Sequence, residues 1–118
     1  MNTVYYLNSC NTCMKIIKEL NLDDSFKLRE IKNNPINSLE LNYLYNKTES
    51  YEALFNKRAV LFKEKKKIQN HFNEQDYKKL ILEHYTFLKR PILIIKNKIF
   101  IGNSKLVIAE ANKFLNEQ

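Results

Sequence analysis

Both cysteines of this 118-residue chain, Cys10 and Cys13, lie close together, with two residues between them. They follow a short apolar segment at the point where a helical pattern begins. If Cys10 lies at or just before the first turn of a helix, both sulfurs lie on one face, within reach of a disulfide bond. The helix N-terminus supplies about half a positive charge and free N–H donors, which lower the pKa of a thiol. The spacing therefore predicts a redox-active pair.

Such a pair can act by nucleophilic attack. The Cys10 thiolate would attack a disulfide, a peroxide or an oxyanion, and Cys13 would resolve the adduct to an internal disulfide. The alternative is that both thiols are small buried core residues without chemistry. We do not expect a metal site, because the two histidines, His71 and His84, do not match the spacing of zinc ligands. The apolar helical pattern around His84 predicts a core histidine instead.

The cysteines belong to a predicted strand–helix–strand unit. An unbroken apolar run at residues 3–7 predicts a buried strand, and alternating apolar and charged residues at 26–31 predict a more exposed one. Between them a helix begins at Asn11 and ends at Asn21. These elements form a βαβ unit, for which a right-handed crossover is expected.

Only helical patterns follow over residues 38–85. The first begins with Ser38 as its N-cap, and later ones cover residues 50–55, 60–67 and 73–85, the last of them capped by Asn73. Aromatic residues recur in this block at helical spacings and are predicted to form its core: Tyr43, Tyr45, Tyr51, Phe55 and Phe62.

The last third of the chain predicts two strands and a helix. Apolar runs at residues 92–95 and 99–101 flank a polar turn, which is typical of a β-hairpin, and a helix over residues 104–115 follows. The segments that connect the helices of this block lack the Gly- and Pro-rich composition of flexible linkers. We therefore expect one α/β domain over residues 1–118, with a helical insertion at about 38–85.

Lys and Arg outnumber Asp and Glu by 20 to 13, a formal net charge of +7. Six basic residues and one acid fall within residues 57–67. Such a run can bind phosphates or an acidic partner, but it is more often a solvated helical face, and we do not expect direct nucleic-acid binding. No segment approaches the roughly 20 apolar residues of a membrane span. Because a signal-peptide pattern is also missing, we expect a cytoplasmic protein without membrane contact.

Three short motifs occur in a characteristic order: residues 6–13 (YLNSCNTC), 54–58 (LFNKR) and 88–92 (LKRPI). Together with the helical block, they resemble the ArsC family, which includes glutaredoxin-type arsenate reductases, the Spx redox regulators and the YffB-like proteins. The resemblance implies a thioredoxin-like fold, with a mixed four-stranded sheet of βαβ and ββα halves and an inserted helical block.

The resemblance also implies roles for individual residues. Cys10 becomes the nucleophile and Cys13 the resolving thiol, Arg58 and Arg90 become cations around the thiolate or an oxyanion, and Pro91 becomes a cis-proline that faces the cysteines. The residue before a proline is held extended, which constrains the direction of the Arg90 side chain. For Arg58, a solvated surface charge is the alternative.

The resemblance implies two possible functions. The first is a thiol-dependent oxidoreductase with no bound cofactor, whose partner is a small thiol or a redox protein and whose reductant is glutathione or a thioredoxin-like protein. Arsenate reductases of this type carry a further arginine after the last strand, where this chain offers Lys105, which favours thiol–disulfide exchange over arsenate reduction. The second is an Spx-like transcriptional regulator that binds the RNA polymerase α subunit through a Cys10–Cys13 disulfide switch.

Overall fold

The structure is a computed structural model that describes residues 2–117, and it divides into two compact units. The first unit contains the chain up to Asn34 and from Arg90 onward, and the second comprises Pro35–Lys89. The first unit holds the βαβ and ββα segments, and the second holds the helical block. The order of elements thus agrees with the sequence patterns, while folding as one domain stays a prediction.

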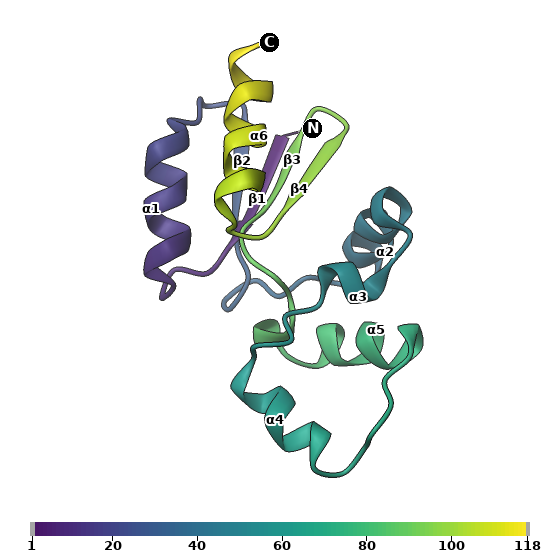
Figure 1. The fold of residues 1–118 in the computed structure, drawn as a ribbon. Coiled ribbons are helices and arrows are strands. Elements are labelled where there is room, and N and C mark those ends of the chain that lie inside the picture. Colours follow the sequence, from purple (N-terminus) through teal and green to yellow (C-terminus); the bar gives the residue numbers. More distant parts are fainter. Residues whose placement is uncertain (1, 118) are drawn as a thin grey trace. The chain divides into compact units, whose positions relative to one another are not determined.

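The first unit is built on a mixed four-stranded sheet with the strand order β2-β1-β3-β4 (Figure 1). The strands β1 and β2 are parallel, whereas β3 is antiparallel to both β1 and β4. Their bounds are β1 Asn2–Tyr6, β2 Phe26–Glu30, β3 Ile92–Ile95 and β4 Lys98–Ile101. This sheet confirms the predicted α/β fold class.

Two helices, α1 (Asn11–Leu20) and α6 (Lys105–Asn116), pack on this sheet. Their buried side chains form one apolar cluster with the strands, made of Val4, Ile16, Leu20, Leu93, Ile95, Phe100 and Ala111. All four residues of β3 are buried, as the unbroken apolar run predicts. This cluster fixes α1 against the sheet, so the first turn of α1 has a defined position after β1.

Local signals set the ends of α1 where the sequence places them. Cys10 is the N-cap, and Asn21 ends the helix in the left-handed conformation with φ 50°. Asparagine tolerates this conformation better than most residues because its short polar side chain can bond locally. The Asn21 N–H donates to the Lys18 carbonyl oxygen, which satisfies one of the terminal carbonyl groups.

The second unit contains four α-helices and one short 3-10 helix. They are α2 Ser38–Thr48, α3 Tyr51–Leu54, α4 Val60–Lys66, α5 Glu74–Glu83 and η1 Tyr85–Phe87. The prediction that Ser38 caps α2 is wrong, because Asn37 is the N-cap. The Asn37 side chain accepts the Glu40 N–H and the Glu40 carboxylate accepts the Asn37 N–H, a reciprocal capping box that Ser38 cannot form from its place inside the helix.

Aromatic side chains form much of the core of the second unit. The Phe55 ring lies 4.8 Å from that of Phe62, 4.7 Å from that of Tyr77 and 5.4 Å from that of Phe87, measured between centroids. The predicted core positions of Tyr51, Phe55 and Phe62 are confirmed. Tyr43 is 44% exposed and does not belong to the core, because it lies on the solvent side of α2. Its ring instead contacts the Lys47 ammonium group, one turn further along the helix.

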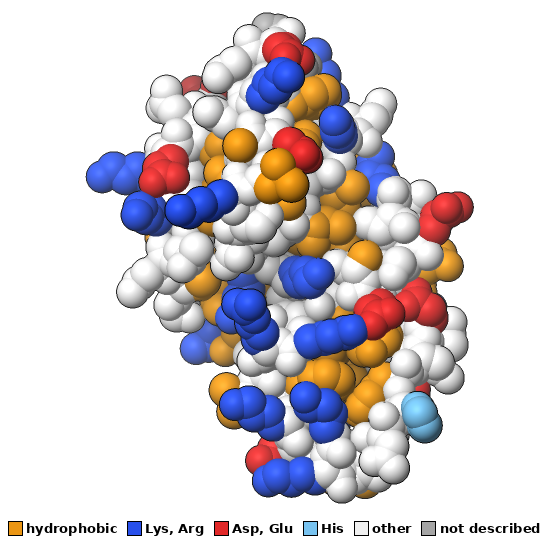
Figure 2. Space-filling model, in the orientation of Figure 1, with side chains coloured by type: hydrophobic (Ala, Val, Ile, Leu, Met, Phe, Trp, Pro, Cys, Tyr) orange, Lys and Arg blue, Asp and Glu red, His pale blue; other side chains and the backbone are white. Residues whose placement is uncertain are grey.

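The basic run at residues 57–67 is largely exposed. Three of its lysines are paired with acids: Lys57 with Glu52, Lys65 with Glu83 and Lys67 with Glu64. Figure 2 shows Lys and Arg side chains scattered over the face in view, separated by uncharged surface and by Asp and Glu side chains. This arrangement agrees with a solvated helical face. Within residues 2–117, no helix is long and apolar enough to cross a membrane.

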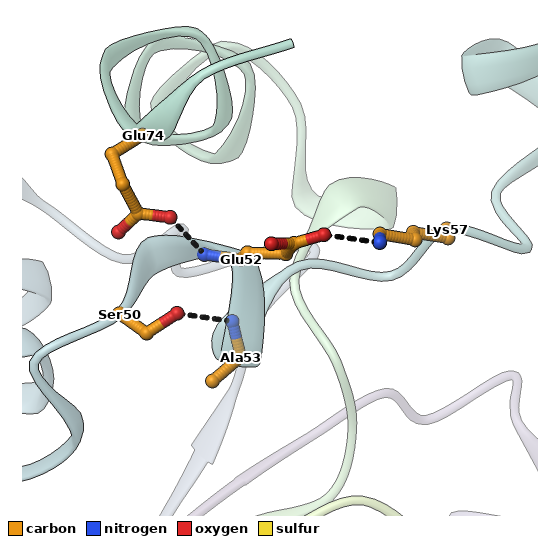
Figure 3. A network of polar contacts seen from close by, with 5 residues as sticks. All are labelled: Ser50, Glu52, Ala53, Lys57 and Glu74. Atoms are coloured by element: carbon orange, nitrogen blue, oxygen red, sulfur yellow. Dashed lines mark hydrogen bonds and ion pairs between the residues drawn. The ribbon is translucent and has the colours of Figure 1, made fainter.

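A single carboxylate connects α5 to α3 (Figure 3). Glu74, the first residue of α5, accepts the backbone N–H groups of Tyr51 at 2.5 Å and Glu52 at 3.1 Å. The Ser50 hydroxyl oxygen accepts the Ala53 N–H at 3.0 Å. A helix of four residues is too short to be stable alone. These acceptors satisfy the N–H groups of α3 that have no partner within the helix.

We predict that Glu74→Ala lowers the free energy of unfolding by about 1–3 kcal/mol, because two backbone donors lose a charged acceptor. Urea denaturation followed by circular dichroism measures this loss. Gln75→Ala, at the exposed neighbouring position, is the matched control and should change stability much less. Equal stability of the two variants would show that the Glu74 contacts contribute nothing.

Candidate active site

Cys10 occupies the N-cap position of α1. Its backbone N–H donates to the Leu7 carbonyl oxygen at 3.0 Å, which closes the turn after β1, and its own carbonyl oxygen accepts the Met14 N–H at 3.1 Å. The Cys10 Sγ accepts the backbone N–H of Cys13 at 3.5 Å. A half-buried sulfur is thus held at the helix N-terminus, where an anion is stabilised.

The surroundings favour the thiolate form of Cys10. Burial raises its pKa, but hydrogen bonds from the backbone and thiol of Cys13 and the hydrogen bond and charge of Arg90 outweigh this effect, so the pKa lies below its ordinary value. Each of these donors stabilises the anion. A lowered pKa increases the fraction of nucleophilic thiolate at neutral pH.

Cys13 has the opposite character. Its side chain is fully buried in the first turn of α1, and both cysteines are free thiols. Burial raises the pKa of Cys13 to about 12, and the hydrogen bond to Cys10 and the charge of its thiolate act in the same direction. At neutral pH Cys13 therefore stays protonated and serves as a hydrogen-bond donor to Cys10. The two thiols thus differ both in burial and in the direction of their pKa shifts.

Arg90 and Pro91 precede β3. The Arg90–Pro91 peptide bond is cis, as the resemblance implies. Pro91 is buried, and its carbonyl oxygen accepts the Gly102 N–H at 2.9 Å, which joins the start of β3 to the turn after β4. Arg90 bonds to Cys10, so Cys10, Cys13 and Arg90 lie together within the first unit. That Pro91 faces the cysteines stays a prediction.

Arg58 belongs to the second unit and lies exposed in the turn between α3 and α4. The Asn56 side chain shapes this turn, because its Oδ1 accepts the Arg58 N–H at 3.2 Å and its Nδ2 donates to the Thr86 carbonyl oxygen at 3.1 Å. A role for Arg58 beside Cys10 stays a prediction. The sequence analysis did not single out Asn56, although it lies within the motif, because a lone asparagine carries no distinct signal for such contacts.

Two of the motifs are joined by backbone hydrogen bonds. The Asn56 N–H donates to the Phe87 carbonyl oxygen at 2.7 Å, and the Lys89 N–H donates to the Leu54 carbonyl oxygen at 2.8 Å. Between these bonds, Phe55 and Leu88 form an antiparallel bridge. The segment that carries Arg58 is thereby paired with the segment that runs directly into Arg90. Residues 54–56 and 87–89 thus form one paired segment within the second unit.

The histidines do not add to this site. The prediction that His84 is a core residue on a helix face is wrong, because His84 ends α5 and is only half-buried. Its Nδ1 accepts the Thr86 N–H at 3.1 Å, so its ring is occupied in capping the following 3-10 helix. Among the side chains of residues 2–117, no group of three or more His, Cys, Asp or Glu is arranged to hold a metal ion.

We predict that one equivalent of iodoacetamide near neutral pH labels Cys10 and leaves Cys13 unmodified, because only Cys10 is accessible and has a lowered pKa. Peptide mass spectrometry locates the label. The same reaction in urea is the control, since both thiols should then react alike. Equal labelling of the two thiols in the native chain would contradict the assignment.

We predict that Arg90→Ala raises the pKa of Cys10 and slows its alkylation at neutral pH, because a hydrogen-bond donor and a positive charge are removed from the thiolate. The absorbance of the thiolate near 240 nm, followed against pH, measures the shift. Lys89→Ala removes the neighbouring cation and serves as the control. A titration unchanged by Arg90→Ala would disprove the pairing of Arg90 with Cys10.

The chain is similar to known proteins both in sequence and in fold. An uncharacterized protein of Haemophilus influenzae is 27% identical over 106 residues, which covers 86% of this chain and 90% of that protein. An ArsC family related protein from Bacteroides fragilis superposes with a TM-score of 0.74 at 20% identity, over 92% of this chain and 95% of that one. A possible arsenate reductase from Streptococcus mutans superposes with a TM-score of 0.61 at 26% identity, over 84% and 87% of the two chains.

The family comparison covers nearly the whole chain. The model of the ArsC family matches residues 5–111, a range that includes both cysteines, all three motifs and most of α6. The fold, with its mixed four-stranded sheet, is also that of the solved structures described above. The chain belongs to the ArsC family.

Proposed function

We propose that this protein is a thiol–disulfide oxidoreductase with Cys10 as its nucleophile and Cys13 as its resolving thiol. The observation that carries the proposal is the contrast between the two thiols. Cys10 is accessible and has a lowered pKa at the N-terminus of α1, whereas Cys13 is buried and has a pKa of about 12. Membership of the ArsC family supports thiol-based chemistry.

In the first step, the Cys10 thiolate attacks one sulfur of a substrate disulfide. A bond forms between Cys10 and that sulfur, the substrate S–S bond breaks, and the other substrate sulfur leaves as a thiolate that takes up a proton from water. Arg90 stabilises the attacking thiolate and holds it within the site. Its hydrogen bond to Cys10 also directs the sulfur, since the guanidinium group is planar and rigid.

In the second step, Cys13 loses its proton and attacks Cys10 Sγ. The bond between Cys10 and the substrate breaks, the second substrate thiol is released, and the Cys10–Cys13 disulfide forms. The first step prepares the second, because the charge of the Cys10 thiolate contributes to the raised pKa of Cys13. Once Cys10 is bonded to substrate, this charge is gone and the positive charge of Arg90 still acts on Cys13. The substrate gains two electrons, and the protein dithiol loses them.

A thiol donor must then return two electrons to the protein disulfide. We propose glutathione or a thioredoxin-like protein for this role, and no bound cofactor. Two molecules of glutathione, or one protein dithiol, balance the cycle by becoming a disulfide. Arg58 and the cis peptide bond at Pro91 complete the proposed site, with Arg58 as a second cation for the thiolate.

A second candidate function follows from the same cysteine pair. In an Spx-like regulator, formation of the Cys10–Cys13 disulfide would alter a surface that binds the RNA polymerase α subunit, and no substrate would be turned over. The position of both cysteines in one helical turn favours a disulfide that forms readily in either case. The two functions differ in one measurable property, because only the oxidoreductase would turn over a disulfide substrate.

We predict that the wild-type protein reduces a disulfide such as hydroxyethyl disulfide catalytically when glutathione or thioredoxin with its reductase is supplied. Loss of NADPH absorbance in the coupled assay measures the rate. Cys10→Ser should abolish the activity, because the nucleophile is lost. Cys13→Ser should still complete the first step and accumulate a mixed disulfide on Cys10 that intact mass spectrometry can detect.

The adduct also identifies the partner. A mass increase that matches glutathione in Cys13→Ser indicates a monothiol cycle, and a protein adduct indicates a protein partner. No turnover and no adduct, together with redox-dependent binding of RNA polymerase, would reject the enzyme in favour of the regulator.

A further inference from the structure

Glu30, the last residue of β2, bonds to the turn that precedes Cys10. Its Oε2 accepts the backbone N–H of Asn8 at 2.9 Å, and its Oε1 accepts the N–H of Asn33 at 2.8 Å. All of these residues belong to the first unit. One carboxylate therefore holds two loops at once, the loop after β1 and the loop after β2.

The register of the sheet explains how this carboxylate reaches the cysteine turn. The strands β1 and β2 are parallel, and Tyr6 is paired with Glu30, so both strands end at the same edge. Beyond Tyr6 the chain turns at once, and the Cys10 N–H closes the turn on the Leu7 carbonyl oxygen. Asn8 lies inside this turn and is exposed to solvent. Its N–H is thus the point at which Glu30 can hold the turn that leads to Cys10.

The charge of Glu30 does not explain why an acid stands at this place. A negative charge near a thiolate raises the pKa of the thiol, so the charge of an acid offers Cys10 no stabilisation. Burial also raises the pKa of Glu30, but the N–H groups of Asn8, Asn33 and Lys32 and the charge of Lys32 outweigh it and hold that pKa below its ordinary value. Glu30 is therefore ionised at neutral pH, and its benefit must come from the geometry that it fixes.

We propose that Glu30 is a positioning residue for Cys10, whose carboxylate holds the turn at residues 7–10 so that Cys10 stays in the N-cap position of α1. The proposal rests on the proposed function, because it assumes that an activated Cys10 is what the site requires. Glu30 acts through the backbone of Asn8 and does not touch the reacting sulfur. When the turn loosens, Cys10 Sγ spends less time against the Cys13 N–H, and the thiolate loses a donor.

The test compares Glu30→Ala with Glu19→Ala, which removes an exposed acid from α1 without a contact to the turn. The pH dependence of Cys10 alkylation is measured for both variants and for the wild type. We expect Glu30→Ala to shift the midpoint to higher pH and to lower the rate at pH 7 severalfold, and Glu19→Ala to behave as wild type. The direction of this shift distinguishes a loosened turn from a simple loss of charge, because loss of the negative charge alone would move the midpoint to lower pH.

Hydrogen exchange supplies a second readout. The Cys13 amide should exchange faster in Glu30→Ala, while amides in the middle of α1 keep their protection, a pattern that general destabilisation would not produce. Glu30→Gln retains one acceptor oxygen and serves if Glu30→Ala does not fold, with a smaller increase in exchange at Cys13. A midpoint that stays or falls in the Glu30 variants, with an unchanged Cys13 amide, overturns the inference. A wild-type Cys10 that titrates as an ordinary thiol would instead overturn the proposed function.

Discussion

The hydrogen bond from the Cys13 amide to the Cys10 sulfur, at 3.5 Å, is the contact on which the site depends. An N-cap side chain normally offers an oxygen to the free N–H groups of the first turn. A neutral thiol is a weak acceptor, whereas a thiolate is a charged one. Capping the helix and activating the cysteine are therefore the same interaction. The apolar cluster under α1 and the turn before Cys10 matter because they hold this contact in place.

The second unit is the long helical insertion, and a different set of contacts stabilises it. Short helices are joined there by side-chain contacts: Glu74 holds the start of α3, and Asn56 holds the turn after it. The backbone pairing of residues 54–56 with residues 87–89 brings the end of the insertion back to its middle. The residues directly before Arg90 are therefore held by backbone pairing. Arg90 itself acts to lower the pKa of both cysteines.

The sequence predicted what depends on local patterns. Periodicity and turn residues located the strands and helices, and the Cys–x–x–Cys spacing located the two thiols at the start of α1. The N-cap of α2 was misplaced by one residue because Asn37 and Ser38 are both good caps, and only the partner at Glu40 decides between them. Glu30 and Glu74 were not recognised, because each bonds to backbone groups 22 or 23 residues away and such pairings depend on the tertiary fold. The relation of Arg58 to the thiols stays a prediction for the same reason.

The use of cysteine as a helix cap has a thermodynamic consequence. Contacts that stabilise the Cys10 thiolate stabilise the reduced protein, and the disulfide form does not share them. If Cys10 and Cys13 form the proposed disulfide, a thermodynamic cycle raises the reduction potential of this couple by that free energy divided by 2F. The start of α1 thus biases the couple toward its dithiol form and makes its disulfide easier to reduce. In the proposed oxidoreductase, the first turn of α1 thereby favours the step in which a thiol donor returns the protein disulfide to the dithiol.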